Sequence, residues 1–410
     1  MGSHDAIAHT VSAVLALVTL ACWTIAEAGA QERPKDEDLS SIIEQLTSHH
    51  GPGTNVSIVD SGSATIPCGM QPKNMIVSRG NDSKSFPVLV EGRRGKATRL
   101  FAKLDRMTVD ADGAGRAYHP DDPLGENSCN PSAKQTEQIC ALDNIGNAGM
   151  RLFQGSARLT TSAAPSDKET FLANWRDLWP LIREEKLTPL RLSTIVGPDG
   201  PRDYNLIHWP ERNLTFAFNT KIVPANEKGY PCLNGRQSKY GGYFLSATAF
   251  KNERRSTGEE CSQAFLDSET IPFFVISKEK FDGIELGDIA IGILASPNDF
   301  RIVYGIAGDI GPYDHFGEGS IAFNKTLLGV ESPVENAKDV DSLDIDIANQ
   351  VRFHGTDSSL AVLLLGGTKR LLNGDFGVSN IRRVGEIQFK RWNVASGSEQ
   401  KLSACLRPTP

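Results

Sequence analysis

Residues 301–328 constrain the fold of this chain more than any other stretch, because a strand, a tight loop and a short helix follow one another there. The first part, 301–307, is rich in β-forming apolar residues and predicts a strand that ends abruptly at Gly308-Asp309. The pattern of 320–328 is that of a short helix. The stretch therefore predicts a strand–loop–helix unit with little freedom between its two ends.

Two carboxylates flank the loop 310–317 of this unit. Asp309 precedes the loop and Glu318 follows it, and glycine and proline residues restrict the conformations between them. Side chains held at a fixed separation in this way suit general acid–base chemistry on a sugar or ester bond. A strand–helix connection with solvated carboxylates explains the same residues, and both interpretations are open at this point.

The composition predicts a globular chain with a sizeable core. Its 410 residues allow one large domain or two ordinary ones. Hydrophobic residues make up 39% of the chain, and 38 Gly and 22 Pro indicate many turns. The net charge of -7 argues against nucleic acid as a partner and suits a cationic ligand.

The N-terminal region has the features of an export signal. Residues 11–26 are uncharged and mostly apolar, too short for a typical membrane span, and Ala28-Gly29-Ala30 fits a signal-peptidase site. We predict a signal peptide over 1–30, a linker and helix over 31–54, and secretion, with the periplasm as a second destination. No Lys or Arg precedes the apolar segment, which leaves an uncleaved anchor as the alternative.

Six cysteines remain after the signal segment. They are Cys68, Cys129, Cys140, Cys232, Cys261 and Cys405. An even number in an exported chain suggests disulfides, and six cysteines allow 15 pairings. Short loops favour Cys129–Cys140 and Cys232–Cys261, which leaves Cys68–Cys405 to join the two ends. The sequence has no CxxC pair and one close histidine pair, His49-His50, so we expect no zinc site.

A second polar stretch follows a predicted strand at 107–109. It begins with Asp110-Ala-Asp112-Gly113, a turn that resembles the start of a calcium loop but lacks the later acidic ligands. We therefore favour a β-turn whose Asp side chains bond their own backbone, and we expect no metal. The residues that follow include Tyr118, His119, Asp121 and Asp122.

The rest of the chain predicts a mainly β protein of the β-rich α+β kind. Helices are expected at 38–49 and 171–187, the second with its tryptophans in the core, and a buried strand at 359–366. Short strands between Gly-rich turns suggest a single domain over 55–400, built as a closed barrel with helices outside. Residues 401–410 are expected to form a tail.

Several short motifs occur in one order along the chain. They are Asp110-Ala-Asp112-Gly113 with Ala117-Tyr118-His119-Pro120, Leu142-Asp143 with Asn147-Ala148-Gly149, Gly242-Tyr243-Phe244-Leu245-Ser246-Ala-Thr248, Ile271-Pro272-Phe-Phe-Val275, Gly287-Asp288, and Gly308-Asp309-Ile-Gly311-Pro312 with Gly317-Glu318-Gly-Ser320-Ile321. In this order they resemble the fungal-type chitosanases, glycoside hydrolase family 75. The resemblance spans about residues 56–366.

The resemblance implies that Asp309 and Glu318 are a catalytic pair. It implies a secreted enzyme that needs no cofactor and hydrolyses β-1,4 linkages in chitosan with inversion. The core is expected to be similar to the six-stranded double-psi β-barrel of other inverting glycanases. The chain departs from the family in a long, divergent interval at 150–240, in its N-terminal helix, and in Gly319, where Ala is commoner.

Inversion requires one protonated carboxyl and one ionised carboxylate. We first assign Glu318 as the acid and Asp309 as the base, although a helix starting after Glu318 favours its ionised form. The roles could be exchanged, or Asp110 or Asp112 could be the base.

Chitosan is a polyamine when protonated, so further acids in a cleft would attract it. The candidate substrate-binding residues are Asp110, Asp112, Tyr118, His119, Asp121, Asp122, Tyr313 and Asp314. We expect chitosan as the partner of a monomer, with no nucleic acid and no membrane once the signal is removed. A glycanase acting on chitin or bacterial wall glycan, and a non-catalytic wall-binding protein, are the alternatives.

Overall fold

The computed structural model describes residues 33–48, 54–61, 68–79, 81–93, 96–129, 139–161, 164–191, 196–197, 200–201, 203–235, 239–252, 261, 265–296, 299–311, 315–349, 358–394 and 401–406. The predicted signal peptide, 1–30, lies outside these residues. The chain is mainly β with some helices, at 36% strand and 24% helix, as the sequence predicts.

The largest element is a mixed sheet of eleven strands. In spatial order its strands are β1 (Asn55–Asp60), β2 (Gln71–Arg79), β3 (Asp82–Arg93), β4 (Lys96–Leu104), β20 (Ser359–Leu365), β16 (Ile289–Ser296), β17 (Asp299–Ile310), β13 (Phe273–Ile276), β18 (Glu318–Ser320), β5 (Arg106–Asp110) and β19 (Ile345–Asp346). Neighbours are antiparallel except β13 with β17 and β18 with β5, which are parallel. The antiparallel pairing of β13 with β18 places the end of β17 near Glu318, the first residue of β18, while Asp110 at the end of β5 pairs with Ser320 at the other end of β18.

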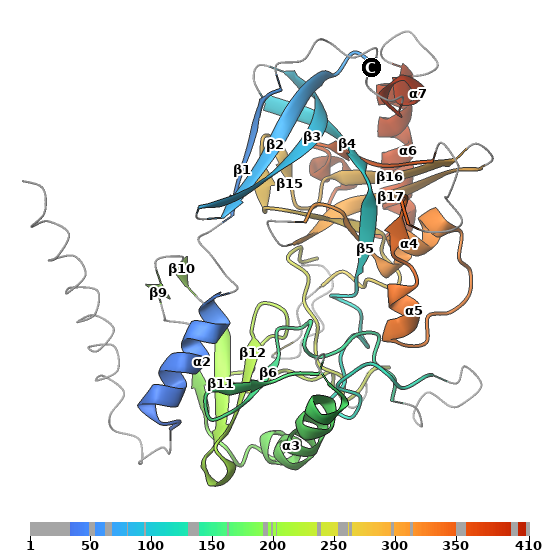
Figure 1. The fold of residues 1–410 in the computed structure, drawn as a ribbon. Helices are drawn as coiled ribbons and strands as arrows, with labels where there is room; N and C mark the ends of the chain where they lie inside the picture. The colour runs from blue at the N-terminus through green and yellow to red at the C-terminus, as the bar shows by residue number, and fades with distance from the viewer. Residues whose placement is uncertain are drawn as a thin grey trace, which may run out of the picture.

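A smaller sheet of five strands lies below the large one (Figure 1). Its order is β7 (Ala157–Leu159), β6 (Arg151–Gln154), β12 (Leu214–Asn219), β11 (Tyr204–Trp209) and β8 (Pro189–Arg191). Helix α2 (Asp36–Ser48) packs Ile42 and Leu46 against this sheet, and α3 (Pro165–Arg183) packs Trp175 against Phe216 of β12. One hydrophobic core contains residues of both sheets, so the two parts are packed together.

The other helices cover the large sheet or join its strands. They are α4 (Ile321–Leu328), α5 (Ala337–Asp341), α6 (Val378–Val394), α7 (Lys401–Leu406) and the short turns η1 (Pro210–Arg212) and η4 (Lys369–Leu372). Helix α6 packs on β16 and β17. Helix α4 begins where the Ser320 hydroxyl accepts a hydrogen bond from the Phe323 N–H, and it ends at Gly329, whose φ is 62°. Two further strand pairs are β9 (Val196–Gly197) with β10 (Gly200–Pro201) and β14 (Lys280–Phe281) with β15 (Ile284–Glu285).

Most of the predicted elements are present, with three differences. The strand predicted at 301–307 continues to Ile310, because Asp309 and Ile310 pair with β13. The apolar stretch 284–295, whose pattern is that of one strand, is two strands, since Gly287 turns the chain with a φ of 92°. Helix α6 was not predicted. The helices expected at 38–49, 171–187 and 320–328 are α2, α3 and α4, and the tryptophans of α3 are buried.

The eleven strands have a linear order, and no pairing among the described residues joins β1 to β19. The closed six-stranded double-psi barrel therefore stays a prediction. Nor does any helix in the described part of the chain have the length and apolar character needed to cross a membrane.

The predicted cysteine pairing is confirmed. Cα separations are 5.2 Å for Cys68–Cys405, 5.5 Å for Cys129–Cys140 and 5.9 Å for Cys232–Cys261. The first pair joins α7 to the segment before β2, so the C-terminal residues 401–406 are part of the fold and not a loose tail.

Candidate active site

Three aspartates from distant parts of the chain meet at one place. Asp110 is the last residue of β5, Asp112 follows in the next turn, and Asp309 is near the end of β17. Carboxylate oxygens of these three residues all lie within 4.8 Å of one another. We call Asp110, Asp112 and Asp309 the acidic cluster.

Their closeness requires a strongly curved sheet. Strands β18 and β13 lie between β5 and β17, and neighbouring strands are about 4.8 Å apart, so a flat sheet would separate β5 from β17 by about 14 Å. Two short Asp side chains do not bridge that span to leave oxygens within 4.8 Å. The sheet must therefore curl at this end and bring the end of β5 back toward β17.

Glu318 lies beside the acidic cluster on β18. A Cβ atom placed on Gly311 would be 2.8 Å from Glu318 Oε2, so this carboxylate rests against the backbone two residues beyond Asp309. Two residues of extended chain span about 6.7 Å. Any side chain at position 311 would displace Glu318, which explains a glycine there.

Asparagine 324 holds the strands under these carboxylates. Its side chain is fully buried, and Nδ2 donates to the carbonyls of Met107, Thr108 and Leu343. A Cβ on Gly319 would meet Asn324 Oδ1 at 2.5 Å, so β18 packs directly on this amide. The glycosylation sequence that starts at Asn324 is therefore inaccessible in the folded chain.

Each carboxylate of the cluster is held by hydrogen bonds. Asp309 Oδ1 accepts from the backbone N–H groups of Ala249 (2.9 Å) and Ile310 (2.6 Å). Asp112 Oδ1 accepts from the Tyr118 hydroxyl (2.6 Å) and the Ser246 hydroxyl (3.2 Å).

Asp110 is held at two atoms. Its Oδ1 accepts from the Asp112 N–H at 2.8 Å, and its carbonyl accepts from the Ser268 hydroxyl at 2.5 Å. Donors within the protein thus bind one carboxylate oxygen of each member of the cluster.

Burial changes the proton affinity of the cluster. It raises the pKa of Asp309 to about 8, and the charges of Asp112 and Glu318 add to the rise. Burial raises the pKa of Asp112 to about 6, although the hydroxyls of Tyr118 and Ser246 work against it. Burial, followed by the charge of Asp309, raises the pKa of Asp110 well above its usual range. The cluster therefore binds a proton at neutral pH.

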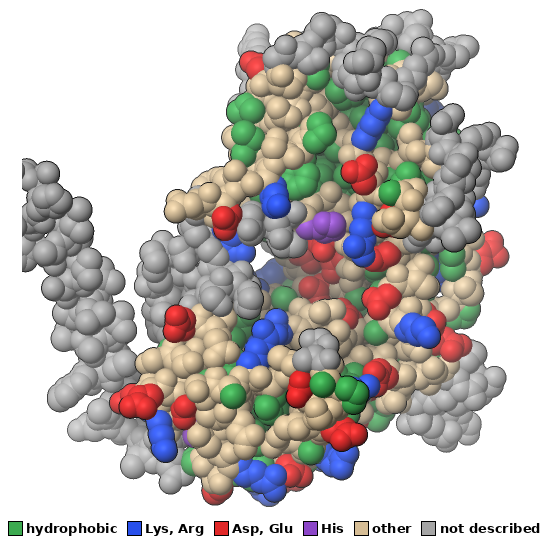
Figure 2. Space-filling view, viewed as in Figure 1, with side chains coloured by type: hydrophobic (Ala, Val, Ile, Leu, Met, Phe, Trp, Pro, Cys, Tyr) green, Lys and Arg blue, Asp and Glu red, His purple; other side chains and the backbone are tan. Residues whose placement is uncertain are grey.

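Among the described residues no Lys or Arg forms an ion pair with the three aspartates. Figure 2 shows acidic side chains at the bottom of a hollow between the part built on the large sheet and the part built on the small sheet. Asp309 is only 8% exposed, while Asp110, Asp112 and Glu318 are half-buried. Asp110, Asp112 and Glu318 are therefore partly accessible to an incoming ligand. Three carboxylates at this spacing are also a feasible set of oxygen ligands for a divalent cation.

Three of the residues predicted to bind substrate are buried and contact other parts of the protein instead. Tyr118 is 1% exposed, so its ring cannot stack on a sugar, and its hydroxyl is bound to Asp112. Asp122 is 4% exposed and accepts from the N–H groups of Ala141, Glu126 and Asn127.

His119 is buried with its ring edge against Tyr243, at 4.5 Å between centroids. Burial lowers its pKa to about 4, so this imidazole is neutral. We withdraw the substrate-binding assignment for Tyr118, His119 and Asp122. Asp121 is exposed, and Tyr313 and Asp314 lie outside the described residues.

Several residues that shape the site were not predicted. Ser246, Ser268 and the Ala249 N–H bind cluster members directly. His315, in the loop between Asp309 and Glu318, has Nε2 at 3.1 Å from both Thr108 Oγ1 and the Gly317 carbonyl. Of these residues, only Ser246 could have been found from the sequence, because it belongs to one of the ordered motifs.

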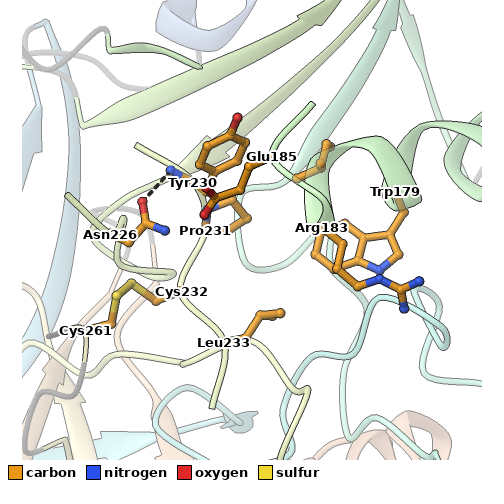
Figure 3. Close-up of a pocket in the computed structure, with 10 residues that line it drawn as sticks. Trp179, Arg183, Glu185, Asn226, Tyr230, Pro231, Cys232, Leu233 and Cys261 are labelled. Atoms are coloured by element: carbon orange, nitrogen blue, oxygen red, sulfur yellow. Dashed lines mark hydrogen bonds between the residues drawn. A yellow bond between two sulfur atoms is a disulfide. The ribbon is translucent and has the colours of Figure 1, made fainter. Parts of the chain in front are cut away.

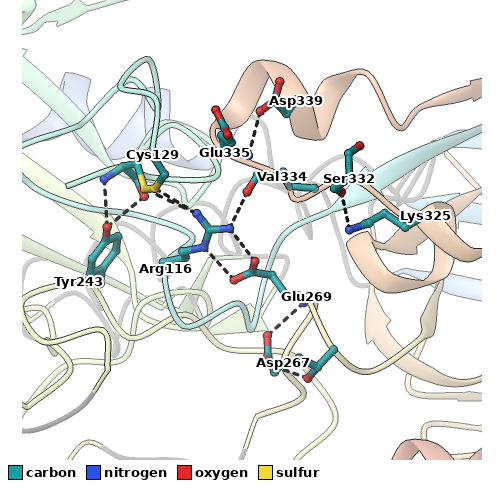
Figure 4. A network of polar contacts seen from close by, with 12 residues as sticks. Arg116, Cys129, Tyr243, Asp267, Glu269, Lys325, Ser332, Val334, Glu335 and Asp339 are labelled. Atoms are coloured by element: carbon teal, nitrogen blue, oxygen red, sulfur yellow. Dashed lines mark hydrogen bonds and ion pairs between the residues drawn. A yellow bond between two sulfur atoms is a disulfide. The ribbon is translucent and has the colours of Figure 1, made fainter. Parts of the chain in front are cut away.

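Figure 4 shows a second polar network, which is centred on Arg116. Arg116 binds Glu269 through two hydrogen bonds of 3.0 and 2.8 Å and donates to the Val334 carbonyl at 2.7 Å. We call Arg116, Glu269 and the Val334 carbonyl the Arg116 brace. Glu269 follows Ser268, so the brace fixes the segment that holds Asp110.

Neither a protein-family model nor a curated protein matches the chain. The resemblance to family 75 therefore rests on the ordered motifs. In the fold, four of those motifs meet at one place, since they contribute Asp110 with Asp112, Ser246, Asp309 and Glu318.

Proposed function

We propose that the mature chain is a secreted, endo-acting, inverting glycoside hydrolase that cleaves β-1,4-glucosamine linkages in chitosan. The observation that carries the proposal is that the three aspartates of the acidic cluster meet, with Glu318 beside them. None of the three aspartates forms an ion pair with a Lys or Arg among the described residues. Burying an ionised carboxylate without a cation beside it costs folding free energy, and such groups concentrate at functional sites.

Asp309 is the proposed general acid. Its pKa of about 8 keeps it protonated at neutral pH, and Oδ1 is fixed by two backbone N–H groups. The proton passes to the glycosidic oxygen as the bond from that oxygen to the anomeric carbon breaks. A carboxylate oxygen of Asp112 lies within 4.8 Å of one of Asp309, closer than the about 6.5–9.5 Å typical of an inverting pair, so its proposed role is to keep Asp309 protonated.

Glu318 is the proposed general base. It removes a proton from a water whose oxygen bonds to the anomeric carbon from the opposite face, which inverts the configuration. It lies against Gly311, two residues beyond Asp309, and the proposed mechanism requires the two carboxyl groups to be about 6.5–9.5 Å apart. Helix α4 starts three residues later and favours an ionised carboxylate. This reverses the roles first assigned from the sequence.

The substrate class follows from charge. Protonated glucosamine units are cationic, and the hollow offers several carboxylates that would attract them. The three cysteine pairs support an exported protein. The curled end of the sheet, where β5 returns toward β17, supports a barrel related to the double-psi type.

The test is reducing-sugar release from chitosan, chitin and peptidoglycan in parallel, with and without EDTA. The proposal requires release from chitosan that EDTA leaves unchanged. Release from chitin or peptidoglycan alone would indicate the related glycanase. Binding to chitosan without products would indicate a wall-binding protein, and loss of activity in EDTA would assign the acidic cluster to a cation.

A further inference from the structure

A separate cavity of about 310 Å³ lies between the end of α3 and the segment 226–233 (Figure 3). Trp179 and Ile182 of α3, together with Tyr230 and Leu233, form much of its wall. The Cys232–Cys261 disulfide also lines it. No residue of the acidic cluster is among its lining residues, so this cavity is distinct from the candidate active site.

The walls of the cavity are preformed, because contacts within the protein hold their side chains in place. Trp179, Ile182 and Tyr230 are buried, and Trp179 stacks on Trp175 at 5.6 Å. The Tyr230 hydroxyl donates to the Leu187 carbonyl, which fixes the ring. Binding sites for small molecules are usually preformed, mostly apolar and about 300–1,000 Å³ in volume. A cavity at the lower limit fits one sugar unit rather than a long chain segment.

Asn226 supplies a directional polar group. Its Oδ1 accepts from the Tyr230 N–H at 3.0 Å, which fixes the orientation of the amide. Figure 3 shows the amide nitrogen on the cavity side, and it has no hydrogen-bond partner among the described residues. The site therefore offers an N–H donor beside an apolar wall, which suits a carbonyl oxygen attached to a small apolar group.

The charges at the cavity disfavour a cation. Arg183 is exposed at its rim. The lining carboxylate, Glu185, is already paired with Lys228. A protonated glucosamine unit would meet a guanidinium and no free carboxylate in this set. An uncharged N-acetylated unit would not be repelled, and its acetamide carries both the carbonyl and the methyl group that the cavity suits.

We propose that this cavity binds N-acetylglucosamine units of partly acetylated chitosan, away from the acidic cluster. The inference rests on the proposed function for its substrate class. Asn226 Nδ2 donates to the acetamide carbonyl, and the methyl group packs against Ile182 and Leu233. The two sites thus divide the polymer, with cationic units at the acidic cluster and acetylated units in the cavity.

The test is a titration of the ¹⁵N-labelled Asp309→Asn protein with two probes, the tetramer of N-acetylglucosamine and the tetramer of glucosamine. The Asn226 side-chain amide resonance, assigned with Asn226→Ser, reports on the cavity. The acetylated tetramer should shift this resonance with a millimolar or tighter Kd, and the deacetylated tetramer should leave it in place. Asn226→Ser should weaken binding about 3- to 10-fold, the size of one neutral hydrogen bond.

Leu233→Trp fills the cavity and should abolish the binding, while Phe300→Trp, at an exposed site on the hairpin of β16 and β17, should not. Asn226→Ser should hydrolyse fully deacetylated chitosan as fast as the unmodified chain. Equal shifts with both tetramers, no shift with either, or unchanged affinity in Asn226→Ser and Leu233→Trp would each overturn the inference. If the tetramer binds but chitosan is not cleaved, the cavity site stands and the proposed function fails.

Discussion

The Arg116 brace and the acidic cluster lie near each other in this protein, and the negative charges of their carboxylates are balanced in different ways. Glu269 of the Arg116 brace has a guanidinium with two matched hydrogen bonds. Asp309 of the acidic cluster has two backbone N–H groups and other carboxylates as neighbours. The guanidinium of Arg116 neutralises the negative charge of Glu269. The carboxylates around Asp309 repel its negative charge, so protonation of Asp309 is favoured.

The difference separates a structural role from a functional one. A paired carboxylate contributes to stability and has little tendency to exchange protons. A buried carboxylate surrounded by other carboxylates, such as Asp309, lowers the stability of the fold when it is ionised. It also exchanges protons near neutral pH. Changes in the brace should therefore alter stability, and changes in the cluster should alter turnover.

The largest effect is expected for Asp309→Asn. The change keeps the size of the side chain and removes the transferable proton, so kcat on chitosan should fall by about 10²–10⁴-fold. The melting temperature should stay the same or rise, because a strained acid is removed. Asp105→Asn, at an exposed position, is the matched control and should keep full activity. Near-normal turnover in Asp309→Asn would remove it from the mechanism.

Arg116→Met should have the opposite pattern. It leaves Glu269 without its partner, and breaking a buried pair costs about 3–5 kcal/mol. We expect about 3 kcal/mol in chemical denaturation, the low end of that range, because 15% and 19% of the two side chains stay exposed. The kcat of the folded fraction should change by less than the effect of Asp309→Asn. A stable variant with lost activity would contradict the comparison.

Stability should fall as the pH rises from about 4 to about 8. The pKa of Asp309 is about 8 in the folded chain and lower when unfolded, so the folded state binds the extra proton in this window. The stabilising contribution is complete below the unfolded pKa and is lost as the pH rises through the folded one. Melting temperatures measured at several pH values should show this slope, and Asp309→Asn should flatten it. Parallel curves for the two proteins would refute the raised pKa.

The smallest expected effect is a shift of the pH–rate profile in Asp112→Asn. Activity requires a protonated Asp309, so the rate should fall as the pH rises past its pKa. Removing the negative charge of Asp112 lowers that pKa, and the basic limb should move to lower pH. An unchanged limb with lower kcat would indicate that Asp112 acts on the substrate and not on Asp309.

The sequence predicted individual strands, helices and cysteine pairs better than it predicted how they pack together. The strand before Asp309, helix α4 and the cysteine pairs follow from residue type and spacing. Helix α6 was not predicted although Ile381, Val384, Phe389 and Trp392 recur at helical spacing and are buried; the strands β16 and β17 that it packs on could not be read from that local pattern. The pKa of Asp309 likewise depends on burial and on Asp112, almost 200 residues away in the chain. That is why the acid and base were first assigned the other way round. The burial of Tyr118 also depends on tertiary packing, which is why it was first assigned to substrate binding.

The central claim is that Asp309 and Glu318 hydrolyse a glucosamine linkage by a single displacement. It is tested most directly by proton NMR during the first minutes of hydrolysis of a β-linked glucosamine oligomer by the mature chain. The account predicts that the α-anomer appears first and converts to the β-anomer only by mutarotation. A β-anomer that appears first would mean a retaining mechanism and would contradict the assigned roles. An oligomer that stays intact would contradict the function itself.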